Sequence, residues 1–132
     1  MEQHQKNAFA IAKWLQEQPR VQYVLYPGLE NHPGYEINKA QTTGFGGMIS
    51  FAVDSAETAR QILEGVKLIK FAESLGGTES LITYPIRQTH TDLTAEECAE
   101  KGITDCLLRF STGIEATQDL IDDLAQAFAA IE

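Results

Sequence analysis

The chain has 132 residues, of which 43% are hydrophobic and 22% are charged. This size and composition predict a single globular domain with one hydrophobic core, and they argue against intrinsic disorder and fibrous repeats. Nineteen acidic and ten basic residues give a formal net charge of −9, which repels nucleic-acid phosphates and acidic membrane surfaces. We therefore expect neither nucleic-acid binding nor a membrane partner, and no apolar run reaches the roughly 20 residues of a membrane span.

The cysteines and the N-terminal residues favour the reducing cytoplasm. The first residues carry no apolar secretory segment, and the chain has two cysteines. Cys98 lies in an acidic segment and Cys106 in an apolar run, so we interpret both as structural thiols.

The first half of the chain alternates between helical and strand patterns. Residues 4–16 have apolar residues at helical spacing, namely Ala8, Ile11, Ala12 and Leu15, and Pro19 ends this helix. A strand over 21–26 closes at Pro27 and Gly28, and a short helix is predicted over 35–40. Residues 45–53 are apolar on both faces, which predicts a strand inside the sheet.

The second half continues the alternation. Asp54 and Ser55 are N-cap candidates for a helix that Gly65 ends, and residues 81–84 form a short strand that Pro85 ends. Thr94 and Glu97 form a capping-box pattern for a helix over 95–101 with Gly102 as its stop. A strand over 105–111 follows, and Thr117 is predicted to cap the last helix, whose buried face comprises Leu120, Leu124, Phe128 and Ile131.

The spacing of these elements decides the fold class. Several strands lie too close together in the sequence for the crossover connections that a fully parallel sheet needs. We therefore predict an α/β fold, a two-layer sandwich with a mostly antiparallel sheet and helices on one face.

Several common kinds of site are not supported. The glycine clusters at 44–47 and 76–77 lack the P-loop lysine and the dinucleotide spacing, and we interpret them as tight turns or close backbone approaches. His4, His32 and His90 do not have metal-ligand spacing, so no metal site is predicted. The chain also has no Gly-x-Ser-x-Gly motif for a nucleophilic serine.

Arg109 is the strongest candidate for a binding residue. It lies in the apolar strand Leu107 to Ser111, where an unpaired guanidinium carries a desolvation penalty and needs an anion. One interpretation is an internal ion pair with Glu79 or Glu115. The other is bidentate capture of a ligand carboxylate by the planar guanidinium.

Five segments in order resemble the C-terminal domain of the Cys/Met-metabolism pyridoxal-phosphate (PLP) enzymes, which include cystathionine γ-synthases, cystathionine β- and γ-lyases and methionine γ-lyases. The resemblance covers nearly the whole chain. The segments are Tyr26-Pro-Gly-Leu with His32-Pro, Gly44-Phe-Gly-Gly-Met-Ile-Ser-Phe51, Ala72-Glu-Ser-Leu-Gly-Gly-Thr-Glu-Ser80, Thr89-His90, and Gly102-Ile with Leu107-Leu-Arg-Phe-Ser-Thr-Gly-Ile-Glu115.

The resemblance implies the small C-terminal domain of a fold-type I PLP enzyme and a role for four residues in substrate binding. Arg109 would bind the α-carboxylate of a sulfur amino acid, and Ser74 would add a hydrogen bond to it through the backbone. Glu73 would line the pocket for the distal side chain, and Thr89 would support Arg109 or the loop that carries Ser74. The family includes both β- and γ-chemistry at carbon–sulfur bonds, and the resemblance leaves that choice open.

The resemblance also implies what lies elsewhere in a longer enzyme. Family members hold PLP through a lysine Schiff base, and the six lysines here, Lys6, Lys13, Lys39, Lys67, Lys70 and Lys101, lie in other sequence contexts. We therefore expect residues 1–132 to be one substrate-clamping domain of a parent enzyme. The N-terminal PLP domain is then absent, with no catalytic residue in this fragment, no PLP bound to it and a homotetrameric parent. The alternative is a non-enzymatic amino-acid-binding regulatory domain that uses Arg109 as its carboxylate receptor.

Overall fold

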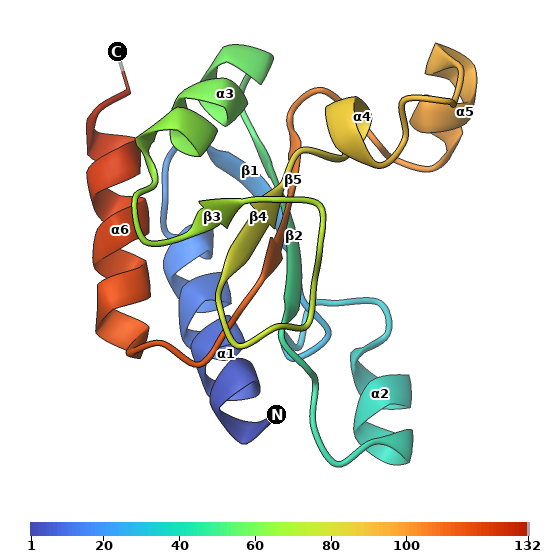
Figure 1. Ribbon diagram of the computed structural model, residues 1–132. Coiled ribbons are helices and arrows are strands. Elements are labelled where there is room, and N and C mark those ends of the chain that lie inside the picture. Colours follow the sequence, from blue (N-terminus) through green and yellow to red (C-terminus); the bar gives the residue numbers. More distant parts are fainter. Residues whose placement is uncertain (132) are drawn as a thin grey trace.

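Five strands form one sheet in the order β1-β2-β5-β4-β3 in the computed structural model, which describes residues 1–131 (Figure 1). The strands are Val21–Leu25 (β1), Met48–Val53 (β2), Lys70–Phe71 (β3), Leu81–Thr83 (β4) and Leu107–Ser111 (β5). Within the described residues, three of the pairings are antiparallel, and β3 pairs with β4 in parallel. The prediction of a mostly antiparallel sheet is confirmed, and the strand predicted over 45–53 inside the sheet is observed over Met48–Val53, between β1 and β5.

The longer helices form a second layer on one face of the sheet. These helices are Glu2–Gln16 (α1), Ala56–Gly65 (α3) and Thr117–Ala129 (α6), and they lie together on one side of the strands in Figure 1. The shorter helices Tyr35–Gln41 (α2), Pro85–Gln88 (α4) and Ala95–Glu100 (α5) lie away from that layer. Among the described helices, none combines the length and apolar character that a membrane crossing requires.

The core lies between the helical layer and the sheet, and it fixes which side chains point outward. The predicted face of α1 is confirmed, because Ala8, Ile11, Ala12 and Leu15 are fully buried. Leu108 and Phe110 of β5 are buried in the same core. Because side chains alternate across a strand, Arg109 lies on the opposite face of the sheet.

The predicted cap of the last helix is wrong. Ala116 occupies the N-cap position without a side-chain hydrogen bond, and Thr117 is the first helical residue. The Thr117 hydroxyl donates instead to Oδ1 of Asn7 at 2.6 Å. Asn7 is fully buried on α1, and its amide nitrogen donates to the carbonyls of Gly113 and Glu115, each at 2.9 Å. A buried amide requires partners at both ends, and Thr117 supplies one of them.

Local capping signals elsewhere behave as expected. The Thr94–Glu97 capping box is confirmed, and Gly102 has a φ of +70° just after α5, a conformation that favours glycine. Helix α4 was not predicted. Pro85 ends the preceding strand as expected, and it is also the first residue of α4, a position that tolerates the missing N–H of proline.

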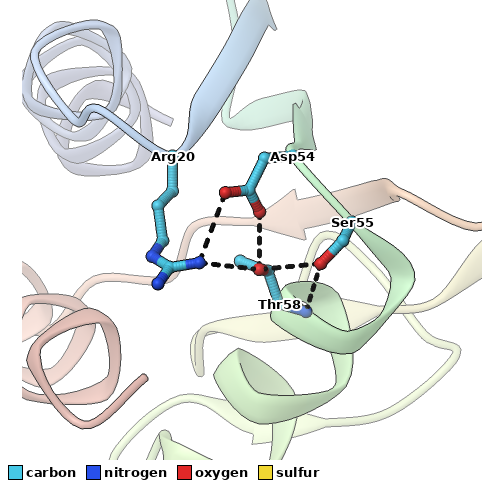
Figure 2. Close-up of polar contacts among 4 residues, drawn as sticks. All are labelled: Arg20, Asp54, Ser55 and Thr58. Carbon is cyan, nitrogen blue, oxygen red and sulfur yellow. Dashed lines mark hydrogen bonds and ion pairs between the residues drawn. The ribbon is translucent and has the colours of Figure 1, made fainter. Parts of the chain in front are cut away.

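A small polar cluster joins the turn after α1 to the start of α3 (Figure 2). The predicted cap at Ser55 is confirmed, because its hydroxyl accepts from the Thr58 N–H at 3.0 Å. Asp54 accepts from the Thr58 hydroxyl and forms a 3.3 Å ion pair with Arg20. The ion pair is partly exposed, so its effect on stability is small, and its main consequence is to fix the two turns together.

A buried carboxylate fixes the segment that leads into β3. Asp123 of α6 accepts hydrogen bonds from the N–H groups of Lys67, Leu68 and Ile69, at 2.8, 3.0 and 2.9 Å. Three donors satisfy this carboxylate away from water. These hydrogen bonds join α6 to the segment before the edge strand β3, and residues 73–80 follow that strand.

Tyr26 predicts a specific loss of stability at high pH. Its ring is fully buried, its hydroxyl donates to the Gly46 carbonyl at 2.9 Å, and burial raises its pKa from 10.0 to about 12. The pKa of Tyr26 is higher in the folded than in the unfolded chain. The contribution of the protonated side chain to the free energy of unfolding is therefore complete below pH 10, and roughly 2 kcal/mol of it is lost as the pH rises to 12. Urea denaturation at pH 9 and pH 11.5 should show this loss in the natural chain and in the exposed-site control Tyr23→Phe. Tyr26→Phe should lack it, and an equal loss in Tyr26→Phe would contradict the assignment.

Candidate functional site

Arg109 lies in β5 between two neighbouring strands. It is opposite Ser50 of β2 and Thr83 of β4, and its side chain is half-buried. The apolar residues on either side of it in the sequence point into the core, so the local β-structure alone directs the guanidinium to the face not covered by α1, α3 and α6. The sheet therefore fixes the base of this side chain.

Within residues 1–131, only neutral groups hydrogen-bond the guanidinium. Arg109 Nη2 donates to the carbonyl oxygen of Glu73 at 2.7 Å and to the Thr83 hydroxyl at 3.3 Å. Nε is buried and has no hydrogen-bond partner in the described chain. Nη1 also has no partner among the described residues and, unlike Nε, is not buried, so an additional acceptor reaches the guanidinium through Nη1.

The interpretation of Arg109 as half of an internal ion pair is wrong. Glu115 uses both carboxylate oxygens on Ser80, accepting from its N–H at 2.6 Å and its hydroxyl at 2.9 Å. Glu79 is exposed, and the ion pairs found within residues 1–131 are Arg20–Asp54 and Arg60–Glu57. Arg109 thus has no carboxylate from the described part of the chain.

Glu73 and Ser74 lie beside Arg109, at the start of an exposed loop. The Glu73 carbonyl accepts from Arg109, and the side chains of both residues are exposed. The peptide between Glu73 and Ser74 is trans, so its N–H points opposite to its C=O. The Ser74 amide is therefore directed away from Arg109 Nη2. A backbone hydrogen bond from Ser74 to a carboxylate on Arg109 requires this peptide to rotate, whereas the Ser74 hydroxyl has no such constraint.

Thr83, which the sequence did not single out, contacts Arg109 directly, whereas the Thr89 hydroxyl has other partners. The Thr83 hydroxyl accepts from Arg109 and donates to the Ala72 carbonyl at 2.6 Å, so it joins the guanidinium to the loop. The Thr89 hydroxyl, at the end of α4, contacts His90 Nδ1 at 2.7 Å and the Pro85 carbonyl at 3.4 Å. The sequence signal for Thr83 is a polar residue at the end of an apolar strand. Its role could not be predicted from this signal, because its partners Ala72 and Arg109 are distant in sequence.

The arrangement is suited to a carboxylate. A guanidinium presents a planar set of donors that matches the two oxygens of a carboxylate, and charge-assisted bonds of this kind are about twice as strong as neutral ones. Nε and Nη1 make no hydrogen bond to any described residue. The chain can therefore bind an acid through Arg109 while Thr83 and the Glu73 carbonyl hold the side chain in place.

The other polar groups do not form a second reactive centre within residues 1–131. No three His, Cys, Asp or Glu side chains of the described residues gather as metal ligands. Burial and the neighbouring Asp105 raise the pKa of the Cys106 thiol, which favours its unreactive protonated form. The glycine-rich segment 44–47 leads into β2 and not into a helix N-terminus, so its glycines do not form a phosphate cradle.

Comparison with known proteins gives a consistent result. The family model for Cys/Met metabolism PLP-dependent enzymes matches residues 1–129. The chain is 52% identical over 128 residues to a cystathionine gamma-lyase of Dictyostelium discoideum, covering 96% of this chain and 33% of that protein. It is 48% identical over 132 residues to a cystathionine gamma-synthase of Haemophilus influenzae, covering 100% of this chain and 31% of that protein.

A solved structure agrees in fold. The crystal structure of cystathionine gamma-lyase from Lactobacillus plantarum complexed with L-serine superposes with a TM-score of 0.94 at 40% identity, covering 99% of this chain and 34% of that one. The chain thus spans about one third of the length of the curated relatives it matches.

A double-mutant cycle tests which threonine supports Arg109. Thr83→Val keeps the shape of the side chain and removes both hydrogen bonds, so it should couple to Arg109→Ala by about 0.5–2 kcal/mol in the free energy of unfolding. The matched control Thr89→Val should show no coupling to Arg109→Ala. Urea denaturation of the single and double variants measures both terms, and coupling through Thr89 alone would reverse the assignment.

Proposed function

Because the chain belongs to the Cys/Met metabolism PLP-dependent enzymes, we propose that residues 1–132 form the C-terminal domain of a longer trans-sulfuration enzyme. The enzyme acts on carbon–sulfur bonds of sulfur amino acids, in the manner of a cystathionine γ-synthase or a cystathionine β- or γ-lyase. The relatives named above carry these names, and this chain matches about a third of each.

The observation that carries the proposal is the state of Arg109. Its guanidinium is half-buried, lacks a carboxylate partner in the described chain and has a buried Nε without an acceptor. An α-amino acid brings a carboxylate of the required charge and shape. The Lactobacillus plantarum relative was crystallised with L-serine, a molecule that carries such a group.

In this proposal the chain binds and orients the substrate. Arg109 holds the α-carboxylate, which fixes the direction of the Cα–H bond relative to the groups that remove its proton. Ser74 adds a hydrogen bond to the same carboxylate, and Glu73 faces the distal end of the substrate from an exposed position. Thr83 takes the supporting role first assigned to Thr89.

The cofactor belongs to the remainder of the enzyme. PLP supplies the electron sink for bond cleavage next to the substrate amino group. The six lysines of the chain do not follow the serine- and threonine-rich strand that precedes the cofactor lysine in the family pattern. The residues that fit the reaction are those that meet the substrate carboxylate, so neither PLP nor its lysine is assigned to this chain.

The partners follow from the position of Arg109. It lies on the sheet face opposite α1, α3 and α6, and a cavity of about 640 Å³ lined by Lys6, Phe9, Tyr26 and Tyr35 does not include it. An N-terminal PLP domain, in a homotetrameric parent, would cover the face of the sheet on which Arg109 lies. A cytoplasmic location is supported by the two free thiols, Cys98 and Cys106.

Arg109→Lys in the longer enzyme tests the clamp. Lysine keeps the charge but loses the planar pair of donors. The kcat/KM for amino-acid substrates should therefore fall, by an amount that corresponds to roughly 1–3 kcal/mol of lost transition-state stabilisation. Arg87→Lys, at an exposed arginine of α4, is the matched control and should leave kcat/KM unchanged. An unchanged kcat/KM in Arg109→Lys would remove Arg109 from the site.

Experiments on the isolated 132-residue chain distinguish the hypothesis of an enzyme domain from that of a regulatory domain. Incubated with PLP and cystathionine, the chain should show no turnover and no absorbance band of protein-bound cofactor. Calorimetric titration with cystathionine, cysteine and methionine should show weak binding, because half a site loses most contacts that offset the entropy of association. Tight binding without turnover would support the regulatory domain, and turnover by the chain alone would overturn the proposal.

A further inference from the structure

Residues 73–80, here named the clamp loop, are held by the chain segment that begins at Arg109. Among the hydrogen bonds that connect the two segments, four follow the loop from its start to its end, and the partners in each of these are 35 or 36 residues apart in sequence. They are Arg109 Nη2 to the Glu73 carbonyl at 2.7 Å, Gly76 N–H to Ser111 Oγ at 2.8 Å, Ile114 N–H to the Thr78 carbonyl at 2.9 Å, and Ser80 N–H to Glu115 Oε1 at 2.6 Å. The loop is therefore fixed along its whole length.

Ser111 fixes the bend of the clamp loop. Its side chain is 2% exposed, and its hydroxyl accepts from the N–H of Gly76. Gly76 has a φ of +74°, so the chain reverses there in a conformation that other residues rarely adopt. The Ser111 hydroxyl stabilises this bend two residues after Ser74.

Glu115 fixes the end of the clamp loop. Its two oxygens accept from the N–H and the hydroxyl of Ser80, which is fully buried. The Ser80 hydroxyl in turn accepts from the Gly113 N–H at 2.8 Å. A side chain at Gly113 would overlap the Thr78 carbonyl oxygen, so the backbones approach closely only because this residue is glycine. Every buried donor in this network has an acceptor, which favours a single arrangement.

The alternation of the sequence explains how one segment does this. Arg109, Ser111, Gly113 and Glu115 are every second residue, and such positions share one face of an extended chain. Their neighbours have other partners: the hydroxyl of Thr112, which is 1% exposed, donates to the carbonyls of His4 at 2.9 Å and Gly47 at 3.0 Å. The side chains of Arg109, Ser111 and Glu115 thus meet the clamp loop, and the backbone N–H groups of Gly113 and Ile114 add two further hydrogen bonds.

We propose that Ser111 and Glu115 are positioning residues for carboxylate binding: they hold the clamp loop so that Ser74 and the Glu73 carbonyl stay beside Arg109. The catalytic consequence rests on the proposed function, whereas the ordering of the loop does not. Neither residue touches the substrate, and each acts through the backbone of residues 74–80.

Amide hydrogen exchange on the 132-residue chain, followed by NMR, tests the ordering of the loop. Ser111→Ala should speed exchange of the Gly76 amide by roughly tenfold, and Glu115→Gln should speed exchange of the Ser80 amide by a similar factor. Thr112→Val removes an adjacent buried hydroxyl that does not bind the loop, and it should leave both amides unchanged. Unchanged exchange in Ser111→Ala and Glu115→Gln would overturn the proposal.

Kinetics of the longer enzyme test the consequence for binding. Ser111→Ala should raise KM for the amino-acid substrate about three- to tenfold with little change in kcat, because a loosened loop weakens binding before the chemical step. The α-amide of the same substrate, tested as a competitive inhibitor, should lose no affinity, whereas a general structural defect would weaken both ligands. An unchanged KM, or equal losses for acid and amide, would overturn the positioning role. If the unmodified enzyme did not act on sulfur amino acids, the proposed function would fail, and amide exchange would still decide whether the two residues order the loop.

Discussion

A half-buried guanidinium without a carboxylate partner in the described chain is the constraint on which this structure depends. The sheet directs Arg109 to the face that α1, α3 and α6 leave open, and within residues 1–131 its guanidinium hydrogen-bonds only a carbonyl and a hydroxyl. Such dipoles offset part of the desolvation of the cation, but less than a carboxylate does. The folded chain therefore retains an unsatisfied donor that a ligand can satisfy, and binding of an acid and stability of the domain are linked.

The residues around Arg109 have hydrogen-bond partners of their own, whereas Arg109 Nε has no acceptor within residues 1–131. Thr83 and Ser111 come from strands, and Glu115 is a carboxylate whose two oxygens accept from the N–H and the hydroxyl of Ser80. Glu115, one of the carboxylates considered as an ion-pair partner of Arg109, is thus occupied with Ser80. In a chain with a net charge of −9, this use of Glu115 keeps a carboxylate from neutralising the guanidinium.

The sequence predicted what short-range patterns determine. The buried face of α1, the caps at Ser55 and Thr94 and the position of β2 inside the sheet follow from neighbours within a few residues, and all are confirmed. Arg109 was also identifiable, because a charged residue in an apolar strand is unusual. The family pattern placed Glu73 and Ser74 near it, which the geometry of the Glu73 carbonyl supports.

The failures share one physical cause, which is that the deciding partner lies far away in sequence. Thr117 was expected to cap its own helix, but a buried amide 110 residues earlier uses its hydroxyl. Thr83 was overlooked because its partners, Ala72 and Arg109, are 11 and 26 residues away. Glu115 was offered as the ion-pair partner of Arg109, and the N–H of Ser80 competes for it successfully. Composition and periodicity do not describe such competition.

The buried amide of Asn7 has a consequence for how the polypeptide is made. Its partners Gly113, Glu115 and Thr117 are 106 to 110 residues later, so Asn7 lacks them until the ribosome has synthesised residues 113–117. Contacts of such long sequence separation form late, after most of the loop-closure entropy has been lost. The segment that carries Arg109 and Glu115 is thus anchored to α1 only once residues 113–117 have met Asn7, which makes a product that stops before them incapable of presenting the complete site.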